Sequence, residues 1–192
     1  IERDHPGAVA LVSIGCGADS NPSPRGGADG GLALCKQHGE ELAAEVKRAD
    51  QQSWRLALIE LEVEYCKMIN DQHGHEAGDA AISEVGRAIR ADLRVGENAY
   101  RLGGEEFAVI LPDTDMDGAY LVAERIRLGI EGLASLPSPI TASLGIAIRE
   151  PGTNLPPEKL FSRADRSMYD AKEAGRNCIR TAGENAAREG AR

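Results

Sequence analysis

Apolar residues along the chain recur at two spacings, one typical of helices and one typical of strands. Helical spacing occurs over residues 34–49, 117–133 and 158–174, and over the later part of 68–93, where a loop precedes a long helix. Short apolar runs that predict strands lie at 54–63, 99–102, 107–111, 140–148 and 178–180. This alternation predicts a mixed sheet covered by helices.

A glycine pair, Gly103-Gly104, lies between the second and third of these strands, at 99–102 and 107–111. Such a dipeptide suits the positive φ angles of a tight hairpin turn. Two glutamates, Glu105 and Glu106, follow it directly. Short motifs match by chance frequently. Taken alone, this one is therefore interpreted as an ordinary turn with solvated carboxylates.

Acidic residues also gather where the strand predicted at 54–63 ends. Glu60, Glu62 and Glu64 alternate along the chain, so a strand conformation places them on one face. The repulsion between such carboxylates is tolerated in water, or is useful around a cation. The pattern leaves both interpretations open.

The length of 192 residues and the hydrophobic content of 42% predict one domain with tails. With 31 acidic and 22 basic residues, the net charge of −9 argues against broad nucleic-acid binding. A protein of this charge that handles a polyphosphate must concentrate its few cations at one place, or recruit Mg²⁺ between its carboxylates and the phosphates.

The arrangement of the cysteines and the apolar runs bears on location. The four cysteines form no C-x-x-C pair, which favours a reducing cytoplasm over a disulfide framework or a zinc site. No apolar run is long enough to span a bilayer, and the start lacks a secretory signal, so we expect no membrane contact by this segment. Because the chain begins without Met, we expect an excised piece of a longer protein.

Four blocks of the sequence resemble the GGDEF domains of the diguanylate cyclase family. Residues 62–79 read E-V-E-Y-C-K-M-I-N-D-Q-H-G-H-E-A-G-D, similar to the family's D-x-D-x-F-K-x-x-N-D-x-x-G-H-x-x-G-D. Residues 100–107 carry a GGEEF form of the signature hairpin, 143–145 match S-x-G, and 164–177 resemble A-D-x-A-x-Y-x-A-K-x-x-G-R-N. The blocks occur in order and cover most of 62–177.

The resemblance implies an α/β (α+β) sandwich with a central, mostly antiparallel five-stranded sheet flanked by helices, similar to adenylyl cyclases and the palm of polymerases. The expected organisation is a linker or partial upstream segment at 1–31, the cyclase domain at 32–181 and a tail at 182–192. It also implies a reaction in which two GTP molecules condense to cyclic di-GMP and pyrophosphate across a transient homodimer.

The resemblance also implies roles for the acidic residues. Glu62 and Glu105 correspond to the ligands of Mg²⁺ (or Mn²⁺), with Val63 as a further metal-binding position. Hard cations of this kind prefer oxygen ligands. Glu105, Glu106 and Lys67 are the predicted catalytic group, in a reaction that depends on positioning and charge neutralisation.

Guanine recognition is carried over to Asn70 and Asp79. An ionised Asp accepts hydrogen bonds only, which suits the N1–H and exocyclic amine that guanine offers and adenine does not. The alternative for Asp79, which follows Gly78, is a helix N-cap.

Phosphate binding is carried over to Lys67, Lys172 and Arg176, and to the backbone of Gly103 and Gly104. Glycines let backbone N–H groups approach a phosphate that side chains would obstruct. The alternative for the three cations is a solvated surface charge. In the last predicted helix, Met168 and Tyr169 are both expected to face the core.

Several positions depart from the family pattern. Glu62 stands where the family prefers Asp, Cys66 replaces a Phe, and residues 29–37 match the family's opening poorly. These departures support an alternative in which the domain has lost turnover and binds GTP or cyclic di-GMP as a regulatory module. A pure dimerisation domain would leave the intact hairpin unexplained. A product-inhibition site for cyclic di-GMP is predicted at Arg94, with Glu97 in place of the usual Asp.

Overall fold

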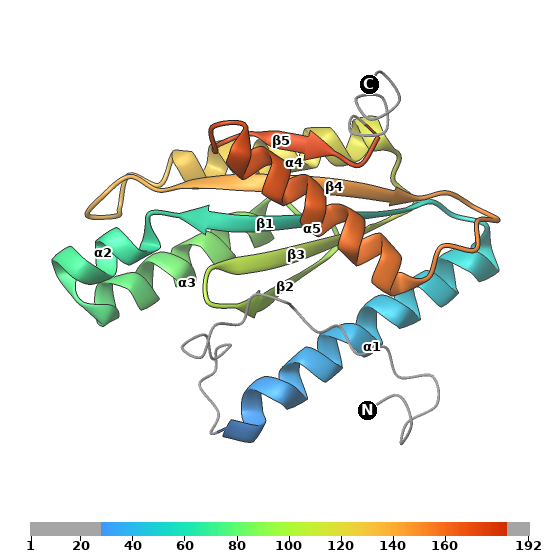
Figure 1. Ribbon diagram of the computed structural model, residues 1–192, viewed down its shortest axis with the longest axis horizontal. Helices are drawn as coiled ribbons and strands as arrows, with labels where there is room; N and C mark the ends of the chain where they lie inside the picture. The colour runs from blue at the N-terminus through green and yellow to red at the C-terminus, as the bar shows by residue number, and fades with distance from the viewer. Residues whose placement is uncertain (1–27, 184–192) are drawn as a thin grey trace.

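The computed structural model describes residues 28–183 of the chain, with side chains from residue 39 onward (Figure 1). In this range, helices and strands follow one another in the order α1 (Ala28–Gln52), β1 (Leu56–Glu64), α2 (Cys66–His73), α3 (His75–Ala91), β2 (Asn98–Gly103), β3 (Glu106–Pro112), α4 (Met116–Glu131), β4 (Thr141–Arg149), α5 (Pro157–Glu173) and β5 (Ile179–Thr181).

The five strands form one sheet in the order β2-β3-β1-β4-β5. β1 is antiparallel to both β3 and β4, β2 is antiparallel to β3, and β5 runs parallel to β4. β1 is therefore the central strand, and its apolar residues are buried on both faces. The sheet confirms the mostly antiparallel, palm-like fold that the sequence predicted.

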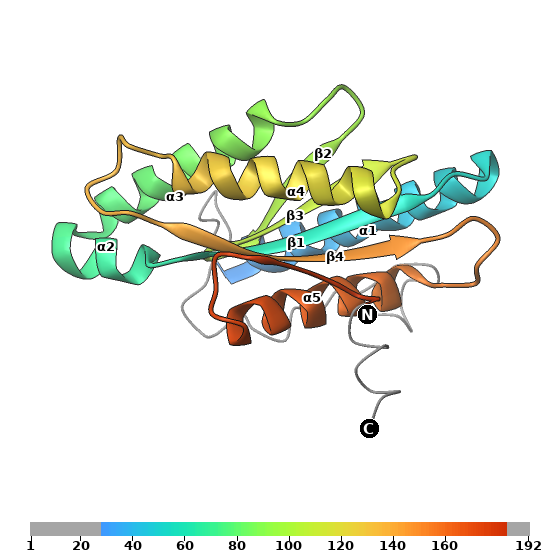
Figure 2. The same cartoon turned by 90° about the horizontal axis from the view of Figure 1, so that it is seen from above.

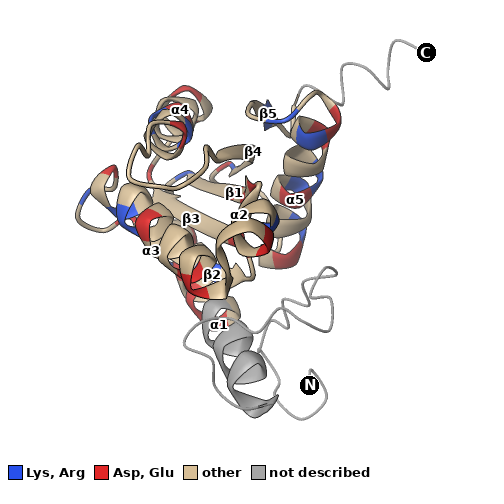
Figure 3. Cartoon of the chain, turned by 90° about the vertical axis from the view of Figure 1, so that its left-hand side faces the viewer, with Lys and Arg blue, Asp and Glu red and all other residues tan. Residues whose placement is uncertain are grey.

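Alternation along β1 divides the core into two parts. Ala57, Ile59, Leu61 and Val63 face one cluster, which contains the apolar sides of α3 and α4. Leu56 and Leu58 face the other cluster, which contains residues of α1 and α5. Figures 2 and 3 show these helices as layers on opposite sides of the sheet. Since Glu60, Glu62 and Glu64 continue the second set, they lie on the α5 side.

Close packing of α5 on the sheet depends on Gly145 in β4. A methyl group on Gly145 would lie 2.1 Å from both the Ala164 carbonyl oxygen and the Met168 nitrogen of α5. Only a residue without a side chain allows this contact. The glycine of the S-x-G block therefore sets the distance between α5 and the central strands.

Two segments differ from the sequence prediction. Residues 66–73 form the helix α2, where the pattern predicted a loop, and α1 begins at Ala28, before the predicted start. α2 buries only Cys66 and Ile69, too few apolar residues to show a helical period. The predicted break is real, because Gly74 at φ 86 separates α2 from α3. Among residues 28–183, no helix combines the length and the apolar character that crossing a membrane would require.

Candidate active site

The carboxyl end of β1 is shaped by a left-handed residue. β1 ends at Glu64, and Tyr65 follows with φ 71 and ψ 6 before α2 begins at Cys66. A bulky side chain in this conformation costs about 1 to 2 kcal/mol, and such strain is concentrated at functional sites. The turn at Tyr65 thus separates the end of β1 from the start of α2.

The turn of the hairpin between β2 and β3 lies beside that strand end, in the same sheet. Its turn residues are Gly104, at φ 50, and Glu105, whereas Gly103 belongs to β2 and lacks a positive φ. The predicted Gly103-Gly104 turn is thus one residue further along. The Arg101 guanidinium closes the turn with hydrogen bonds of 3.0 and 2.6 Å to the Gly104 carbonyl oxygen.

The turn is fixed to β1 through the backbone. The Val63 N–H donates a 3.0 Å hydrogen bond to the Glu105 carbonyl oxygen. Across the same two strands, Glu62 is paired with Glu106, so their side chains project from the same face. The structure therefore brings Glu62, Glu105 and Glu106 together at one edge of the site.

These carboxylates repel one another. Burial, followed by the charge of Glu62, raises the pKa of Glu105 and likewise the pKa of Glu106. Lys172 acts in the opposite direction on both groups. A cation placed among these oxygens would relieve the repulsion, because an opposite charge favours the ionised carboxylate.

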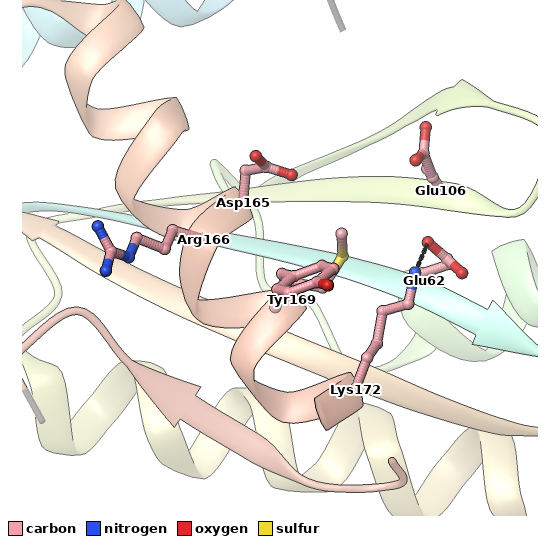
Figure 4. Close-up of a pocket in the computed structure, with 7 residues that line it drawn as sticks. Glu62, Glu106, Asp165, Arg166, Tyr169 and Lys172 are labelled. Atoms are coloured by element: carbon pink, nitrogen blue, oxygen red, sulfur yellow. Dashed lines mark hydrogen bonds and ion pairs between the residues drawn. The ribbon is translucent and has the colours of Figure 1, made fainter. Parts of the chain in front are cut away.

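Lys172 supplies positive charge from the last turn of α5. Its Nζ lies 2.8 Å from Glu62 Oε2. The two side chains border a cleft of about 470 Å³ between α5 and the sheet (Figure 4), lined by Glu62, Glu106, Asp165, Arg166, Met168, Tyr169 and Lys172. The cleft is open at the surface and large enough for part of a nucleotide.

Glu105 has a second neighbour in Cys66, the residue in place of the family's Phe. The thiol is buried and hydrogen-bonded to the Glu105 carboxylate. Burial, together with the charge of Glu105, raises the pKa of Cys66 to about 12. Cys66 is therefore a neutral thiol that can hold Glu105 in place.

The three glutamates of β1 share one face, as predicted, but they meet different surroundings. Glu62 lines the cleft. Glu64 is buried and accepts hydrogen bonds from the hydroxyl groups of Thr141 and Ser143, which explains the serine of the S-x-G block. Glu60 is buried, and burial raises its pKa well above the usual range, which favours the protonated form.

The predicted guanine contacts lie on the two helices that follow β1. A methyl group on Gly78 would sit 1.9 Å from Asn70 Oδ1, so Gly78 makes room for the Asn70 carboxamide beside Asp79. Asp79 lies inside α3, whose N-cap residue is Gly74. The N-cap alternative for Asp79 is therefore wrong, and its role in guanine recognition stays a prediction.

The other predicted cations take separate positions. Lys67 is exposed near the start of α2, and Arg176 is exposed in the loop after α5, at φ 65. Of the three, only Lys172 contacts a candidate metal ligand directly. The structure assigns neither Lys67 nor Arg176 to a phosphate.

The predicted product-inhibition residues share a tight turn between α3 and β2. The Arg94 N–H donates a 2.7 Å hydrogen bond to Glu97 Oε2, and the Glu97 N–H donates to the Arg94 carbonyl oxygen at 3.2 Å. Arg90 also bonds the Glu97 carbonyl oxygen, at 3.1 Å. The Glu97 carboxylate, predicted to bind cyclic di-GMP together with Arg94, is thus hydrogen-bonded to the Arg94 backbone.

The donor atoms fit a hard cation in type. Glu62 and Glu105 offer carboxylate oxygens, and because the Val63 side chain lies in the core, only its backbone could contribute to a metal site. In the part of the chain that the structure describes, no group of three or more His, Cys, Asp or Glu side chains is arranged to hold an ion. Metal binding here would depend on two carboxylates and the phosphates of a bound nucleotide.

Residues of α5 were partly missed by sequence reasoning. Asp165 and Tyr169 line the cleft at helical spacing from Lys172. Met168 is buried, as expected, but Tyr169 is 56% exposed, so the expectation that it faces the core was wrong. The spacing of Asp165, Tyr169 and Lys172, four and then three residues apart, could have placed all three on one face of α5.

A palm-like sheet whose central strand ends in a carboxylate, next to a Gly-Glu hairpin and a lysine from the last helix, defines the class of nucleotidyl cyclase domains. The comparisons agree. A family model described as "Diguanylate cyclase, GGDEF domain" matches residues 36–178. The chain belongs to the GGDEF domain family.

Relatives and solved structures extend this result. The chain is 34% identical over 151 residues to the diguanylate cyclase DgcS of Shewanella oneidensis, covering 78% of this chain and 50% of the relative. It is 34% identical over 145 residues to the response regulator PleD of Caulobacter vibrioides, covering 72% and 32%. The chain therefore spans half or less of the length of these relatives.

Among solved structures, the GGDEF domain of DgcB from Caulobacter crescentus in complex with c-di-GMP has a TM-score of 0.70 and 30% identity, covering 77% of this chain and 90% of that one. The active GGEEF domain of a diguanylate cyclase from Vibrio cholerae has a TM-score of 0.68 and 26% identity, covering 74% and 92%. The second of these carries the same form of the signature motif in its name.

Proposed function

We propose that residues 32–181 are a diguanylate cyclase that condenses two GTP molecules to cyclic di-GMP. The observation that carries the proposal is the position of Glu105, whose backbone is bonded to the end of β1 and whose carboxylate lies near Glu62 and Lys172. Membership of the GGDEF family supports GTP as the substrate. Residues 1–31 would be a linker or a partial upstream segment. The reaction would take place in the cytoplasm.

The reaction makes and breaks one P–O bond at each nucleotide. The 3′-oxygen of one GTP attacks the α-phosphorus of the other, the bond to the β-phosphate breaks, pyrophosphate leaves, and the hydroxyl proton passes to solvent. A second, identical step closes the ring. Mg²⁺ or Mn²⁺, when bound, neutralises the phosphate oxygens.

Each residue has a role in this reaction. Glu62 and Glu105 would hold the metal, and Glu106 would add charge at the same edge. Lys67, Lys172 and Arg176 would orient the phosphates, and the Gly103-Gly104 backbone would let the α-phosphate approach closely. Asn70 and Asp79 would select guanine through hydrogen bonds to its Watson–Crick edge.

The proposal includes a homodimer because the resemblance to diguanylate cyclases implies that each subunit presents one nucleotide. Two copies arranged antiparallel would each present one GTP to the other. Each copy supplies one attacking hydroxyl group and one α-phosphate. The dimer needs to form only transiently, as the two chains meet for each catalytic cycle.

A specific observation favours a second candidate, a regulatory domain that binds GTP or cyclic di-GMP without turnover. Glu62 is one methylene longer than the family's Asp, and its Oε2 is paired with Lys172 at 2.8 Å. A shift of about one bond length disturbs the near-octahedral geometry that Mg²⁺ requires. In this candidate, Arg94 and Glu97 would supply the binding site for cyclic di-GMP.

Calorimetric titration with GTP and a turnover assay on the same samples separate the two candidates. The cyclase requires GTP binding and product from the wild type. Binding without product would favour the regulatory domain, and recovery of product in Glu62→Asp would then locate the defect at this side chain.

Asp79→Ala is expected to weaken GTP binding while leaving the weaker binding of ATP unchanged, whereas an equal loss for both nucleotides would remove Asp79 from guanine recognition.

A further inference from the structure

The loop after α5 contains three consecutive residues with positive φ. Gly175, Arg176 and Asn177 have φ values of 114, 65 and 45. The first is explained by the end of the helix, because the Arg176 N–H donates to the Ala171 carbonyl oxygen at 3.1 Å and the Gly175 N–H to the Lys172 carbonyl oxygen at 3.4 Å. This capping pattern needs a glycine at 175 and does not account for the next two residues.

Asn177 is held in its conformation by α4. Arg127 Nη1 donates a 2.8 Å hydrogen bond to Asn177 Oδ1, and Asn177 Nδ2 donates a 2.9 Å bond to Glu131 Oε1. Arg127 Nη1 also bonds Glu131 Oε2 at 2.9 Å, which closes a ring of three side chains. Both polar ends of the Asn177 carboxamide are thus engaged by one helix.

Arg127 is itself rigidly placed. Its Nε and Nη2 each donate a 2.8 Å hydrogen bond to the Glu124 carboxylate, and its side chain is only 13% exposed. Hydrogen bonds to Glu124 and Glu131 raise the pKa of Arg127 and keep the guanidinium charged. Bidentate hydrogen bonds between a guanidinium and a carboxylate are stronger than hydrogen bonds between neutral groups.

This contact connects the two layers of helices around the edge of the sheet. α4 packs on one face and α5 on the other, and the loop between α5 and β5 passes along the edge between them (Figure 2). Arg127 and Asn177 are 50 residues apart in the sequence. The loop is therefore hydrogen-bonded to a distant helix, none of whose residues lines the cleft.

We propose that Arg127 and Glu131 are positioning residues that orient the Arg176 guanidinium toward the nucleotide phosphates, an inference that rests on the proposed function. Arg176 is exposed and follows Lys172 by four residues, so the two cations leave the same end of α5. Both Arg176 and Asn177 have a left-handed backbone, so the network on Asn177 fixes the path of the chain where the Arg176 side chain begins. Asn adopts this conformation readily, whereas a long side chain such as that of Arg176 persists in it only where the surroundings offset the cost.

Hydrogen exchange tests the first half of the proposal without any nucleotide. In Arg127→Ala, and in the milder Glu131→Ala, the amides of residues 175–178 should exchange faster than in the wild type. Arg125→Ala is the matched control, because this arginine lies on the same helix but pairs with Asp92. Unchanged exchange at 175–178 in folded Arg127→Ala would overturn the proposal.

GTP affinity tests the second half. Arg127→Ala should weaken GTP binding by about tenfold, on the scale of one lost charge-assisted contact, and should have no further effect in an Arg176→Ala background. Equal losses in both backgrounds, or wild-type affinity in Arg127→Ala, would contradict the positioning role. If the wild type itself bound no GTP, the proposed function would fail, and the exchange result would still decide whether Arg127 orders the loop.

Discussion

Glu60 shows how the position of one residue along a strand decides its chemistry. It lies two residues before Glu62 on the same face of β1, yet it is 3% exposed and its Oε2 has no hydrogen-bond partner among the residues that the structure describes. Burial, then the charges of Asp165 and Glu106, raises its pKa well above the usual range. The sequence pattern alone could not separate these two glutamates, because alternation predicts the face and not the depth.

The raised pKa of Glu60 makes the free energy of unfolding dependent on pH. A carboxyl whose pKa is higher in the folded state contributes stability below its unfolded pKa of about 4.3, and that contribution is lost as the pH rises toward the folded pKa. Glu60→Gln should therefore be more stable than the wild type at neutral pH and should flatten the decline. Urea unfolding from pH 4.5 upward would measure the free energy of unfolding of both proteins. If it fell equally with pH in the wild type and in Glu60→Gln, the raised pKa of Glu60 would be contradicted.

Cys66 should be chemically inert in the folded protein. With a pKa of about 12 and a buried thiol, it carries a negligible fraction of reactive thiolate at neutral pH. Treatment with iodoacetamide in native buffer, followed by peptide mass spectrometry, should leave Cys66 unmodified and modify it fully after denaturation. Rapid native alkylation of Cys66 would show that the thiol is not held against Glu105.

At the scale of elements, the sequence located the strands and most helices but not how they meet. The S-x-G block was recognisable as a motif, whereas its physical reason appears only in the contact between Gly145 and the backbone of α5. Helix α2 was missed because its two buried residues give no period. The hairpin was predicted at the right place and its turn one residue early, because the positive φ belongs to Gly104 alone.

The packing of α5 predicts a contrast between two glycine substitutions. Gly145→Ala should destabilise the domain by about 1 to 3 kcal/mol or more, as overpacking against fixed backbone does. Gly86→Ala, in α3, meets only one Phe107 atom at 4.0 Å and should be neutral or stabilising by up to about 1 kcal/mol. Chemical denaturation of both variants measures the difference, and equal effects would contradict the packing described for α5.

In the whole molecule, the carboxyl end of the central strand β1 collects what the blocks of sequence carry separately. Glu62 from β1 and Lys172 from α5 line one cleft, and Glu105 from the hairpin lies near both of them. Their proximity was predicted through the family resemblance, since nothing in the spacing of these residues specifies an ion pair. The network of Arg127, Glu131 and Asn177 lay beyond sequence reasoning, because it joins segments with no shared motif.

Chromatography of a reaction mixture shows whether the protein makes cyclic di-GMP, the activity proposed for it. The chain would be incubated with GTP and Mg²⁺ or Mn²⁺ at two protein concentrations, beside Glu105→Ala and the α4 control Arg125→Ala. We predict cyclic di-GMP from the wild type and the control, with a rate per chain that rises with concentration, and no product from Glu105→Ala. Absence of product from wild-type protein that binds GTP, or equal product from Glu105→Ala, would contradict it.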